Sequence, residues 1–281
     1  MDNQRNMTAP GPIGIFDSGY GGLTILHKIR EKMPQYDYIY LGDNARAPYG
    51  PRSFEIVYRF TLQAVEKLFS MGCHLVILAC NTASAKALRS IQQHDLPLID
   101  PARRVLGVIR PTVEAIDGMT RTGHVGVLAT SGTVKSQSYA LEIHKLYPDI
   151  TVTSLACPMW VPLIEYGEYE NEGADFFIKK YIDAIFAQDN LIDTLILGCT
   201  HYPIVADKIK RHLPGGVRLV QQGEHVAESL ADYLKRHPDM DSKCTKNGHT
   251  QFFTTENEEK FAESASVFLK TEINVKGIEL E

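Results

Sequence analysis

Short apolar runs alternate along the chain with longer segments in which apolar residues recur every three or four positions. The short runs are typical of buried strands in a parallel sheet, and the longer segments are typical of amphipathic helices. Strands separated by helices indicate βαβ units, so the pattern predicts an α/β protein with mostly parallel sheets. The predicted strands are Pro12–Phe16, Tyr38–Leu41, Leu75–Ala79, Leu98–Ile99, Val125–Leu128, Thr151–Leu155 and Thr194–Leu197.

Two helices can be placed by their starts. Ser53 is a suitable N-cap for a helix whose apolar face carries Phe54, Val57, Phe60, Ala64 and Leu68. Near the C-terminus, Gln251–Thr254 is a predicted strand, and Thr255 and Glu258 after it fit a capping box. The helix that would follow has an apolar face formed by Phe261, Ala265, Phe268 and Leu269.

The chain also partly repeats itself. Ile13–Gly19 resembles Val125–Ser131, and Val76–Thr82 resembles Thr194–Thr200, in the same order and at nearly the same separation. Together the matches predict two similar three-layer α/β domains with the functional site in the cleft between them. The last ~60 residues have no counterpart in the repeat, so we expect them to return to the first half. The expected domains are residues 1–103 with 218–281, and residues 104–217.

Charge and composition exclude several classes of protein. The net charge is −5, from 34 acidic and 29 basic residues, and no Lys/Arg cluster has the density of a nucleic-acid footprint. The first ten residues are polar and do not form a signal peptide. Apolar stretches such as Leu75–Cys80 are far shorter than a membrane span. We therefore expect a soluble, cytoplasmic protein with neither nucleic acid nor membrane as a partner.

Five cysteines stand at wide spacings with no CxxC pair, which argues against a disulfide framework. Cys80 and Cys199 follow matching strands of the two halves, and each precedes a predicted helix, Ala83–Ile91 or Ile204–His212. A helix N-terminus favours the thiolate form of a thiol whose ordinary pKa is ~8.5. Cys157 also ends a strand, but Pro158 after it breaks the pattern.

Ligands of open α/β sheets bind beyond the carboxyl ends of the strands, where these cysteines lie. Two opposed thiols can remove a proton from one face of a carbon atom and return a proton to the other face. His201 lies two residues beyond Cys199 and Asp17 lies at the end of the first strand, so either could assist in proton transfer. Backbone N–H groups at helix starts suit a carboxylate ligand, together with the polar side chains of Ser18, Asn81, Thr82, Thr133 and Thr200.

Less specific readings of the same residues remain open. Lone cysteines are often core residues, Asp17 could cap a turn, and His201 could be a satisfied buried imidazole. A zinc site from Cys80, Cys199 and His201 has no evident fourth ligand and no standard spacing. Gly19–Gly22 lacks the Lys-Ser/Thr of a phosphate loop and is more simply a tight turn. A non-catalytic dicarboxylate-binding protein would also suit two lobes around a cleft.

Four segments resemble glutamate racemases of the aspartate/glutamate racemase superfamily, and the likeness runs from about residue 11 to the C-terminus. The segments are Gly14–Thr24, Tyr40–Gly50, Ala79–Ala85 and Leu197–Pro203. The resemblance implies a cofactor-independent, two-base interconversion of L- and D-glutamate that supplies D-glutamate for peptidoglycan. It also suggests a homodimer. The closest alternative is a relative in the same superfamily that acts on aspartate or a hydantoin.

The resemblance also implies roles for individual residues. Cys80 would take the α-proton from D-glutamate and Cys199 from L-glutamate, with help from Asp17 and His201. Glu165 matches a family carboxylate with a supporting role. Substrate contacts would come from Asp17–Ser18, Tyr49–Gly50, Asn81–Thr82 and Thr200–His201. The chain departs from the family at Arg110, where an acidic residue is usual, and its first ten residues have no clear match.

Overall fold

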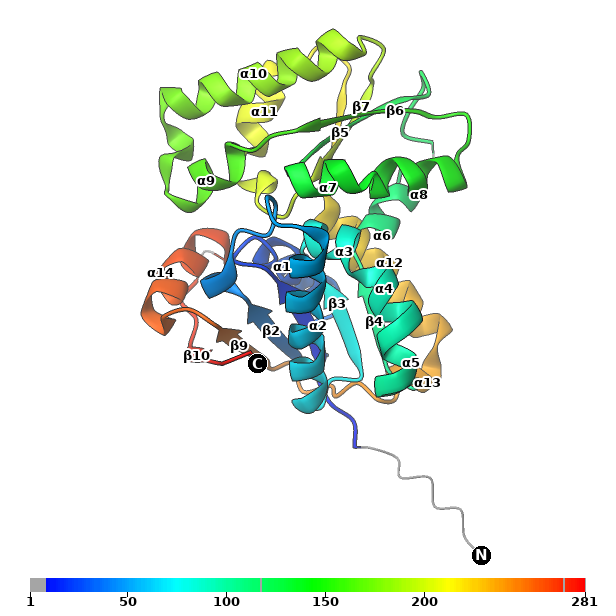
Figure 1. The fold of residues 1–281 in the computed structure, drawn as a ribbon, viewed down its shortest axis with the longest axis vertical. Coiled ribbons are helices and arrows are strands. Elements are labelled where there is room, and N and C mark those ends of the chain that lie inside the picture. Colours follow the sequence, from blue (N-terminus) through cyan, green and yellow to red (C-terminus); the bar gives the residue numbers. More distant parts are fainter. Residues whose placement is uncertain (1–8, 117, 270, 281) are drawn as a thin grey trace, which may run out of the picture.

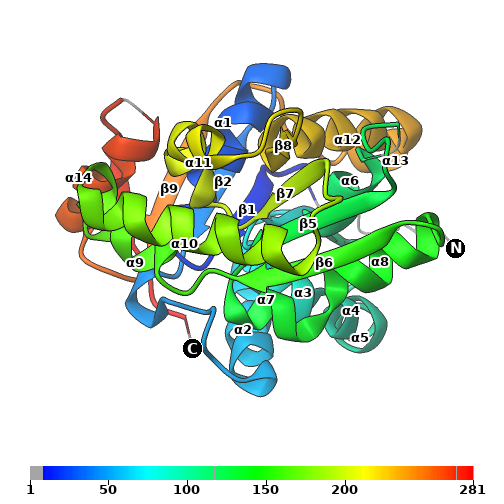
Figure 2. The same cartoon turned by 90° about the horizontal axis from the view of Figure 1, so that it is seen from above.

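A computed structural model describes residues 9–116, 118–269 and 271–280. In this part of the chain the strands form two all-parallel sheets, one of six strands and one of four. The sheet of four strands and its helices lie above the sheet of six in Figure 1, and Figure 2 shows the same arrangement from above. The predicted α/β class and the two similar halves are therefore confirmed.

The first half is built on the six-stranded sheet, in the order β10-β9-β2-β1-β3-β4. Its strands are β1 (Ile13–Asp17), β2 (Tyr38–Gly42), β3 (Leu75–Leu78), β4 (Arg104–Gly107), β9 (Thr250–Thr254) and β10 (Val275–Gly277). Its helices are α1 (Leu23–Lys32), η1 (Asn44–Arg46), α2 (Phe54–Ser70), α3 (Asn81–Lys86), α4 (Leu88–Ser90), η2 (Ile91–Asp95), α5 (Leu96–Ile99), α12 (Gln222–Arg236), α13 (Pro238–Asp241) and α14 (Glu258–Leu269).

The second half is built on the four-stranded sheet, in the order β6-β5-β7-β8. Its strands are β5 (His124–Ala129), β6 (Thr151–Ala156), β7 (Thr194–Gly198) and β8 (Arg218–Val220). Its helices are α6 (Ile109–Glu114), α7 (Ser131–Ser136), α8 (Ser138–Leu146), α9 (Trp160–Glu165), η3 (Glu168–Glu170), α10 (Glu172–Gln188), η4 (Tyr202–Val205) and α11 (Ala206–His212).

Each sheet is buried between two layers of helices because its strands alternate apolar side chains between the two faces. In β1, Ile13 and Ile15 pack toward α1, α12 and α14, whereas Phe16 packs toward α2 and α3. In β7, Leu195 and Leu197 join the core under α10, while Ile196 joins the core under α8. The result is the predicted three-layer arrangement in both halves.

The strand orders support the internal repeat. The order β2-β1-β3-β4 in one sheet corresponds to β6-β5-β7-β8 in the other, so β1 matches β5 and β3 matches β7. The strands β9 and β10 extend the first sheet beyond β2, and Figure 1 shows this red and orange C-terminal part beside the blue N-terminal strands. The C-terminal strands thus return to the first half, as expected.

Two strands lie on the other side of the expected domain boundaries. β4 begins at Arg104 yet belongs to the first sheet, and β8 begins at Arg218 yet belongs to the second. Both are short edge strands with an exposed arginine at the start, so neither had an apolar run that marked it in the sequence. The exact division of the chain into domains stays a prediction.

One strand prediction was wrong, and the strand predicted over Thr151–Leu155 and the helix predicted after Ser53 are present but more exposed than a core element. Leu98–Ile99 belongs to the helix α5, and Leu98 is 87% exposed, because two adjacent apolar residues do not define a period. The strand β6 is only partly buried because it forms an edge of its sheet. Phe54 begins α2 at the surface, 48% exposed, although Ser53 caps this helix as predicted through the N–H of Ile56.

The capping box predicted before α14 is also wrong. Asn257 caps the helix by accepting a hydrogen bond from the N–H of Lys260 at 3.0 Å. The hydroxyl of Thr255 instead donates to Asp43 Oδ1 at 2.9 Å, and Glu258 Oε1 accepts from the N–H of Gly277 at 2.6 Å. The tertiary contacts of the neighbouring loop and of β10 took both side chains away from the helix end.

Candidate active site

A cavity of about 170 Å³ lies between the two halves, at the carboxyl ends of their strands. From the first half it is lined by Ser18, Ala47, Pro48, Tyr49, Gly50, Pro51, Cys80, Asn81 and Thr82. From the second half it is lined by Thr130, Ser131, Cys157, Pro158, Val161, Pro162, Glu165, Cys199, Thr200 and His201. The cleft predicted between the halves is therefore present, and both cysteines of the repeat reach it.

Cys80 stands at the N-cap of α3, just beyond β3. Its sulfur lies 3.3 Å from the Ser18 hydroxyl and accepts a hydrogen bond from the N–H of Ala83 at 3.4 Å. Burial raises the pKa of Cys80 to about 12; the charge of Asp17 also raises it, and the two hydrogen bonds act in the opposite direction. The thiolate expected from the helix start is thus disfavoured here, because α3 is short and burial outweighs it.

Cys199 follows β7 directly and lies beside an imidazole. Its sulfur is 3.9 Å from Nδ1 of His201, whose Nε2 is 2.9 Å from Oε1 of Glu165. Burial alone would lower the pKa of His201, but the hydrogen bonds with Cys199 and Glu165 raise it to about 10. The helix predicted over Ile204–His212 begins with the short turn η4 and continues as α11, so no α-helix starts at Cys199.

Asp17 is the last residue of β1 and is fully buried. Its Oδ2 accepts from the N–H of Gly19 at 2.9 Å, and its Oδ1 accepts from the hydroxyl of Thr200 at 3.4 Å. Burial raises the pKa of Asp17, while the neighbouring His201 acts to lower it. Asp17 does not line the cavity itself, so it reaches the site through Thr200 and through its field on Cys80.

The turn Gly19–Gly22 brings the two halves into close contact. A Cβ atom on Gly21 would lie 2.3 Å from Thr200 Oγ1 and 2.5 Å from His201 Nδ1, closer than real Cβ contacts allow. The turn is closed by hydrogen bonds from the N–H of Leu23 to the carbonyl of Tyr20 and from the N–H of Thr24 to Gly21. As predicted, the glycines form a tight turn and not a phosphate loop, and the second half packs closely against this turn.

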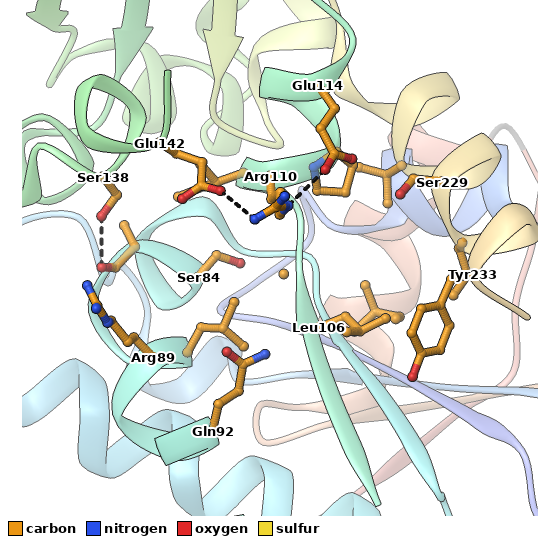
Figure 3. Close-up of a pocket in the computed structure, with 18 of the residues that line it drawn as sticks. Ser84, Arg89, Gln92, Leu106, Arg110, Glu114, Ser138, Glu142, Ser229 and Tyr233 are labelled. Carbon is orange, nitrogen blue, oxygen red and sulfur yellow. Dashed lines mark hydrogen bonds and ion pairs between the residues drawn. The ribbon is translucent and has the colours of Figure 1, made fainter. Parts of the chain in front are cut away.

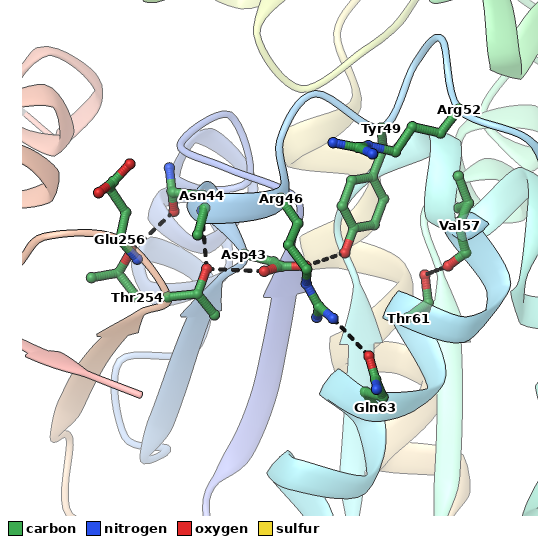
Figure 4. Close-up of polar contacts among 12 residues, drawn as sticks. Asp43, Asn44, Arg46, Tyr49, Arg52, Val57, Thr61, Gln63, Thr254 and Glu256 are labelled. Atoms are coloured by element: carbon green, nitrogen blue, oxygen red, sulfur yellow. Dashed lines mark hydrogen bonds and ion pairs between the residues drawn. The ribbon is translucent and has the colours of Figure 1, made fainter. Parts of the chain in front are cut away.

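Tyr49 is held against the cavity by a buried carboxylate that the sequence did not reveal. Its hydroxyl donates to Asp43, and Figure 4 shows both residues beside Arg46. Asp43 also accepts from Arg46 Nε at 2.7 Å and from the Thr255 hydroxyl. The ring of Tyr49 packs against Phe16. The loop after β2 is therefore pinned from three sides, which places Tyr49 and Gly50 at the cavity wall.

Threonines from both halves meet on another wall. The hydroxyl of Thr82 lies 2.9 Å from that of Thr130 and 3.4 Å from that of Thr133. Thr130 and Ser131 line the cavity, whereas Thr133 stands behind them as part of α7. Of the residues predicted to bind substrate, Ser18, Tyr49, Gly50, Asn81, Thr82, Thr200 and His201 line the cavity, and Asp17 and Thr133 do not.

Cys157 lines the cavity, although Pro158 after it breaks the sequence pattern that Cys80 and Cys199 share. The strand-end rule alone would have selected it. Burial raises its pKa well above the ordinary value, and its sulfur lies 3.9 Å from the carbonyl of Leu155. All five cysteines lie in the described part of the chain and are free thiols.

Among residues 9–116, 118–269 and 271–280, no group of three or more His, Cys, Asp or Glu side chains could hold a metal ion. In the same part of the chain, no helix has the length and apolar character needed to cross a membrane. The first eight residues, most of the unmatched N-terminal segment, lie outside the described residues.

Arg110, the departure noted in the sequence, lies away from the site. It lines a second and wider cavity of about 780 Å³, where it pairs with Glu114 at 2.8 Å and with Glu142 at 3.1 Å (Figure 3). The first pair lies within α6, and the second joins α6 to α8 on the surface. The arginine is thus satisfied by neighbours in its own half.

Comparisons with known proteins agree with this geometry. Residues 23–230 match the family Asp/Glu/Hydantoin racemase, and the chain belongs to that family. Within it, the chain is similar to the glutamate racemase of Ruegeria sp., with 38% identity over 93% of this chain and 97% of the relative.

Two solved structures extend the likeness to the whole fold. A glutamate racemase isoform from Bacillus anthracis matches with a TM-score of 0.87 and 34% identity, covering 96% of this chain and 98% of the other. The glutamate racemase of Francisella tularensis, solved in complex with D-glutamate, matches with a TM-score of 0.86 and 36% identity. That match covers 97% of this chain and 98% of the other.

Proposed function

We propose that the cavity between the halves interconverts L- and D-glutamate by proton transfer through Cys80 and Cys199. The chain acts as a glutamate racemase, an amino-acid isomerase, and its full-length similarity to enzymes of that name supports this activity. The observation that carries the mechanism is that two cysteines at equivalent strand ends, one from each half, line the same cavity.

The reaction needs two groups because the α-proton leaves one face of the carbon and returns to the other. A thiolate takes the α-proton and becomes a thiol, and the electron pair of the broken C–H bond stays on the substrate. The opposite thiol then donates its proton to that carbanion and becomes a thiolate. The enzyme ends each turnover with its two protonation states exchanged.

The surroundings of the sulfurs suggest the resting state. With its pKa raised to about 12 by burial, Cys80 is a thiol at neutral pH. His201, with its pKa raised to about 10, is an imidazolium 3.9 Å from the sulfur of Cys199. This cation faces Cys199, the thiol that would take the proton from L-glutamate, and among the described residues no such cation faces Cys80.

The polar lining supplies donors for the two carboxylates of the substrate. Ser18, Asn81, Thr82 and Thr200 carry hydroxyl or amide donors at the cavity wall. Such fixed dipoles also stabilise the charge that develops on the substrate as the α-proton leaves, and they cost no reorganisation during the reaction. Asp17 and Glu165 act on the site through Thr200 and His201.

Proton exchange with solvent tests the proposal. In heavy water, incubation with either pure enantiomer should replace the α-hydrogen with deuterium and abolish the optical activity, as followed by proton NMR and circular dichroism. Cys80→Ala and Cys199→Ala are the matched controls, in which the optical activity should persist. Retention of the α-hydrogen by the wild-type protein would identify a glutamate-binding protein and overturn the proposal.

A panel of substrates decides between members of the family. L-aspartate and a 5-substituted hydantoin, offered at the same concentration as L-glutamate, should lose optical activity much more slowly. Supply of D-glutamate to peptidoglycan, a cytoplasmic location and a homodimer stay predictions that rest on the resemblance to glutamate racemases. Sedimentation of the purified chain measures the last of these.

A further inference from the structure

Gln222 is a buried polar residue that the proposed mechanism does not use. It is the first residue of α12, is 2% exposed, and lies where α3, α6, α8 and α12 meet. Its side-chain amide forms hydrogen bonds with Asn81, Thr112 and Tyr139. Only one of these three partners, Asn81, lines the cavity.

The direction of these hydrogen bonds follows from Thr112. Its hydroxyl donates its only proton to the carbonyl of Val108 at 2.7 Å, so its oxygen can only accept from Gln222. The Nε2 of Gln222 therefore faces Thr112, at 2.9 Å. Its Oε1 then faces Asn81 and accepts from Nδ2 of that residue at 2.6 Å.

Tyr139 completes the arrangement from the second half. Its hydroxyl accepts from Gln222 Nε2 at 2.8 Å and donates to Asn81 Oδ1 at 2.8 Å. The carbonyl oxygen of Asn81 is thereby turned toward Tyr139 and Gln222, away from any role as an acceptor for substrate. The amide nitrogen keeps a second N–H, which has no partner among the described residues.

We propose that Gln222 is a positioning residue that holds the Asn81 amide with its unpaired N–H toward a substrate carboxylate. The inference rests on the proposed function. An amide without this support can rotate by half a turn and present its oxygen, which repels a carboxylate. Thr112 and Tyr139 belong to the second half, whereas Asn81 belongs to the first. The orientation of Asn81 therefore depends on how the two halves pack against each other.

The first test is Gln222→Met, which keeps the length of the side chain and removes its hydrogen bonds. Without Gln222 the Asn81 amide would no longer be held for its hydrogen bond to the substrate carboxylate. Loss of a hydrogen bond to a charged group should raise KM by about tenfold or more for both enantiomers, with a smaller fall in kcat. Gln221→Met is the control: Gln221 is the exposed residue before Gln222, makes no side-chain cap, and its replacement should leave KM unchanged.

The second test asks whether the effect passes through Asn81. In an Asn81→Ala background, Gln222→Met should raise KM no further, because the group it positions is gone. A KM effect of Gln222→Met that persists in full without Asn81, or an unchanged KM in the single variant, overturns the inference. Racemisation by the wild-type chain is measured in the same experiment, and its absence would overturn the proposed function instead.

Tyr139→Phe keeps the test open if Gln222→Met does not fold, as judged by thermal melting. The change removes only the hydroxyl that donates to Asn81 Oδ1 and leaves the ring in place. The expected result is a rise in KM that is smaller than that of Gln222→Met and that also disappears in the Asn81→Ala background. A purely structural role would lower the melting temperature and leave KM as it is.

Discussion

Cys80 and Cys199 stand at equivalent places in the two halves, yet their neighbours differ. Cys80 meets a neutral hydroxyl and a backbone N–H, with the buried Asp17 nearby. Cys199 meets an imidazole that is itself held by Glu165. The first environment favours an uncharged sulfur, and the second favours a sulfur beside a cation.

The two halves share one backbone arrangement, but during racemisation one thiol must be protonated while the other is not. The repeat supplies two strand ends that reach one cavity. If both ends were alike, the two thiols would compete for the same protonation state, whereas racemisation needs one acid and one base. The backbone places the two sulfurs equivalently, so the side chains around each sulfur decide which one acts as acid and which as base.

Removal of either thiol should have the largest effect. Cys80→Ala and Cys199→Ala are each expected to lower racemisation by at least about a thousandfold, because each removes an acid/base group. With serine in place of cysteine, Cys199→Ser should slow deuterium exchange from L-glutamate more, and Cys80→Ser exchange from D-glutamate more. The measurement is initial exchange by proton NMR from each enantiomer.

The control for this comparison is Cys244→Ala, a buried cysteine outside the cavity, which should keep its activity. Equal slowing in both directions by the two serine variants would show that the two ends of the cavity are interchangeable.

Loss of the imidazole should have the next largest effect, about a hundredfold in kcat for His201→Asn. In the wild type, activity should fall as pH rises through about 10, where His201 loses its charge. Glu165→Gln removes one hydrogen bond that raises this pKa, so its alkaline fall should begin at lower pH. A pH profile that is the same in Glu165→Gln and the wild type would contradict the assignment.

The free energy of unfolding should also depend on pH through His201. The pKa of His201 is higher in the folded chain than the ~6.5 of an unfolded one, so its stabilising contribution is complete below about pH 6.5. That contribution is lost as pH rises through about 10. The difference in unfolding free energy between the wild type and His201→Asn, from urea titrations, should therefore narrow between these pH values.

Contact between the halves is tested by Gly21→Ala. The added Cβ would meet Thr200 and His201 and would push the second half away from the turn, so kcat should fall about tenfold or more, as expected from a small misplacement. Gly215→Ala is the matched control, because nothing lies within 4 Å of its added Cβ. Steady-state kinetics of both variants measure the effect, and equal activity would contradict the close approach.

The smallest effect is expected from Ser18→Ala. The hydroxyl of Ser18 acts to lower the pKa of Cys80, so its loss should make the Cys80 thiolate harder to form. Proton abstraction from D-glutamate should slow by about fivefold to tenfold, while abstraction from L-glutamate changes less. The measurement is the ratio of the two exchange rates. An unchanged ratio would indicate that Asp17, and not Ser18, has the larger effect on the pKa of Cys80.

Much of the architecture was predictable from the chain alone. Apolar runs such as Ile13–Phe16 and Leu75–Leu78 predict central strands because both faces of those strands are buried. The repeat predicts two halves, and the strand-end rule places Cys80 and Cys199 at one site. The edge strands β4 and β8 escaped prediction, because a strand with an exposed side has no continuous apolar run.

Contacts between distant parts of the chain decided the rest. Asp43 accepts a hydrogen bond from Tyr49, and Glu165 raises the pKa of His201. Gln222 accepts a hydrogen bond from Asn81. None of these pairs follows from spacing along the sequence. The sequence by itself determined the central strands, the repeat and the two thiols, because periodicity and position along a strand are local properties. Only the tertiary structure decided which thiol is neutral and which faces a cation, because burial and charge depend on neighbours that the fold brings together.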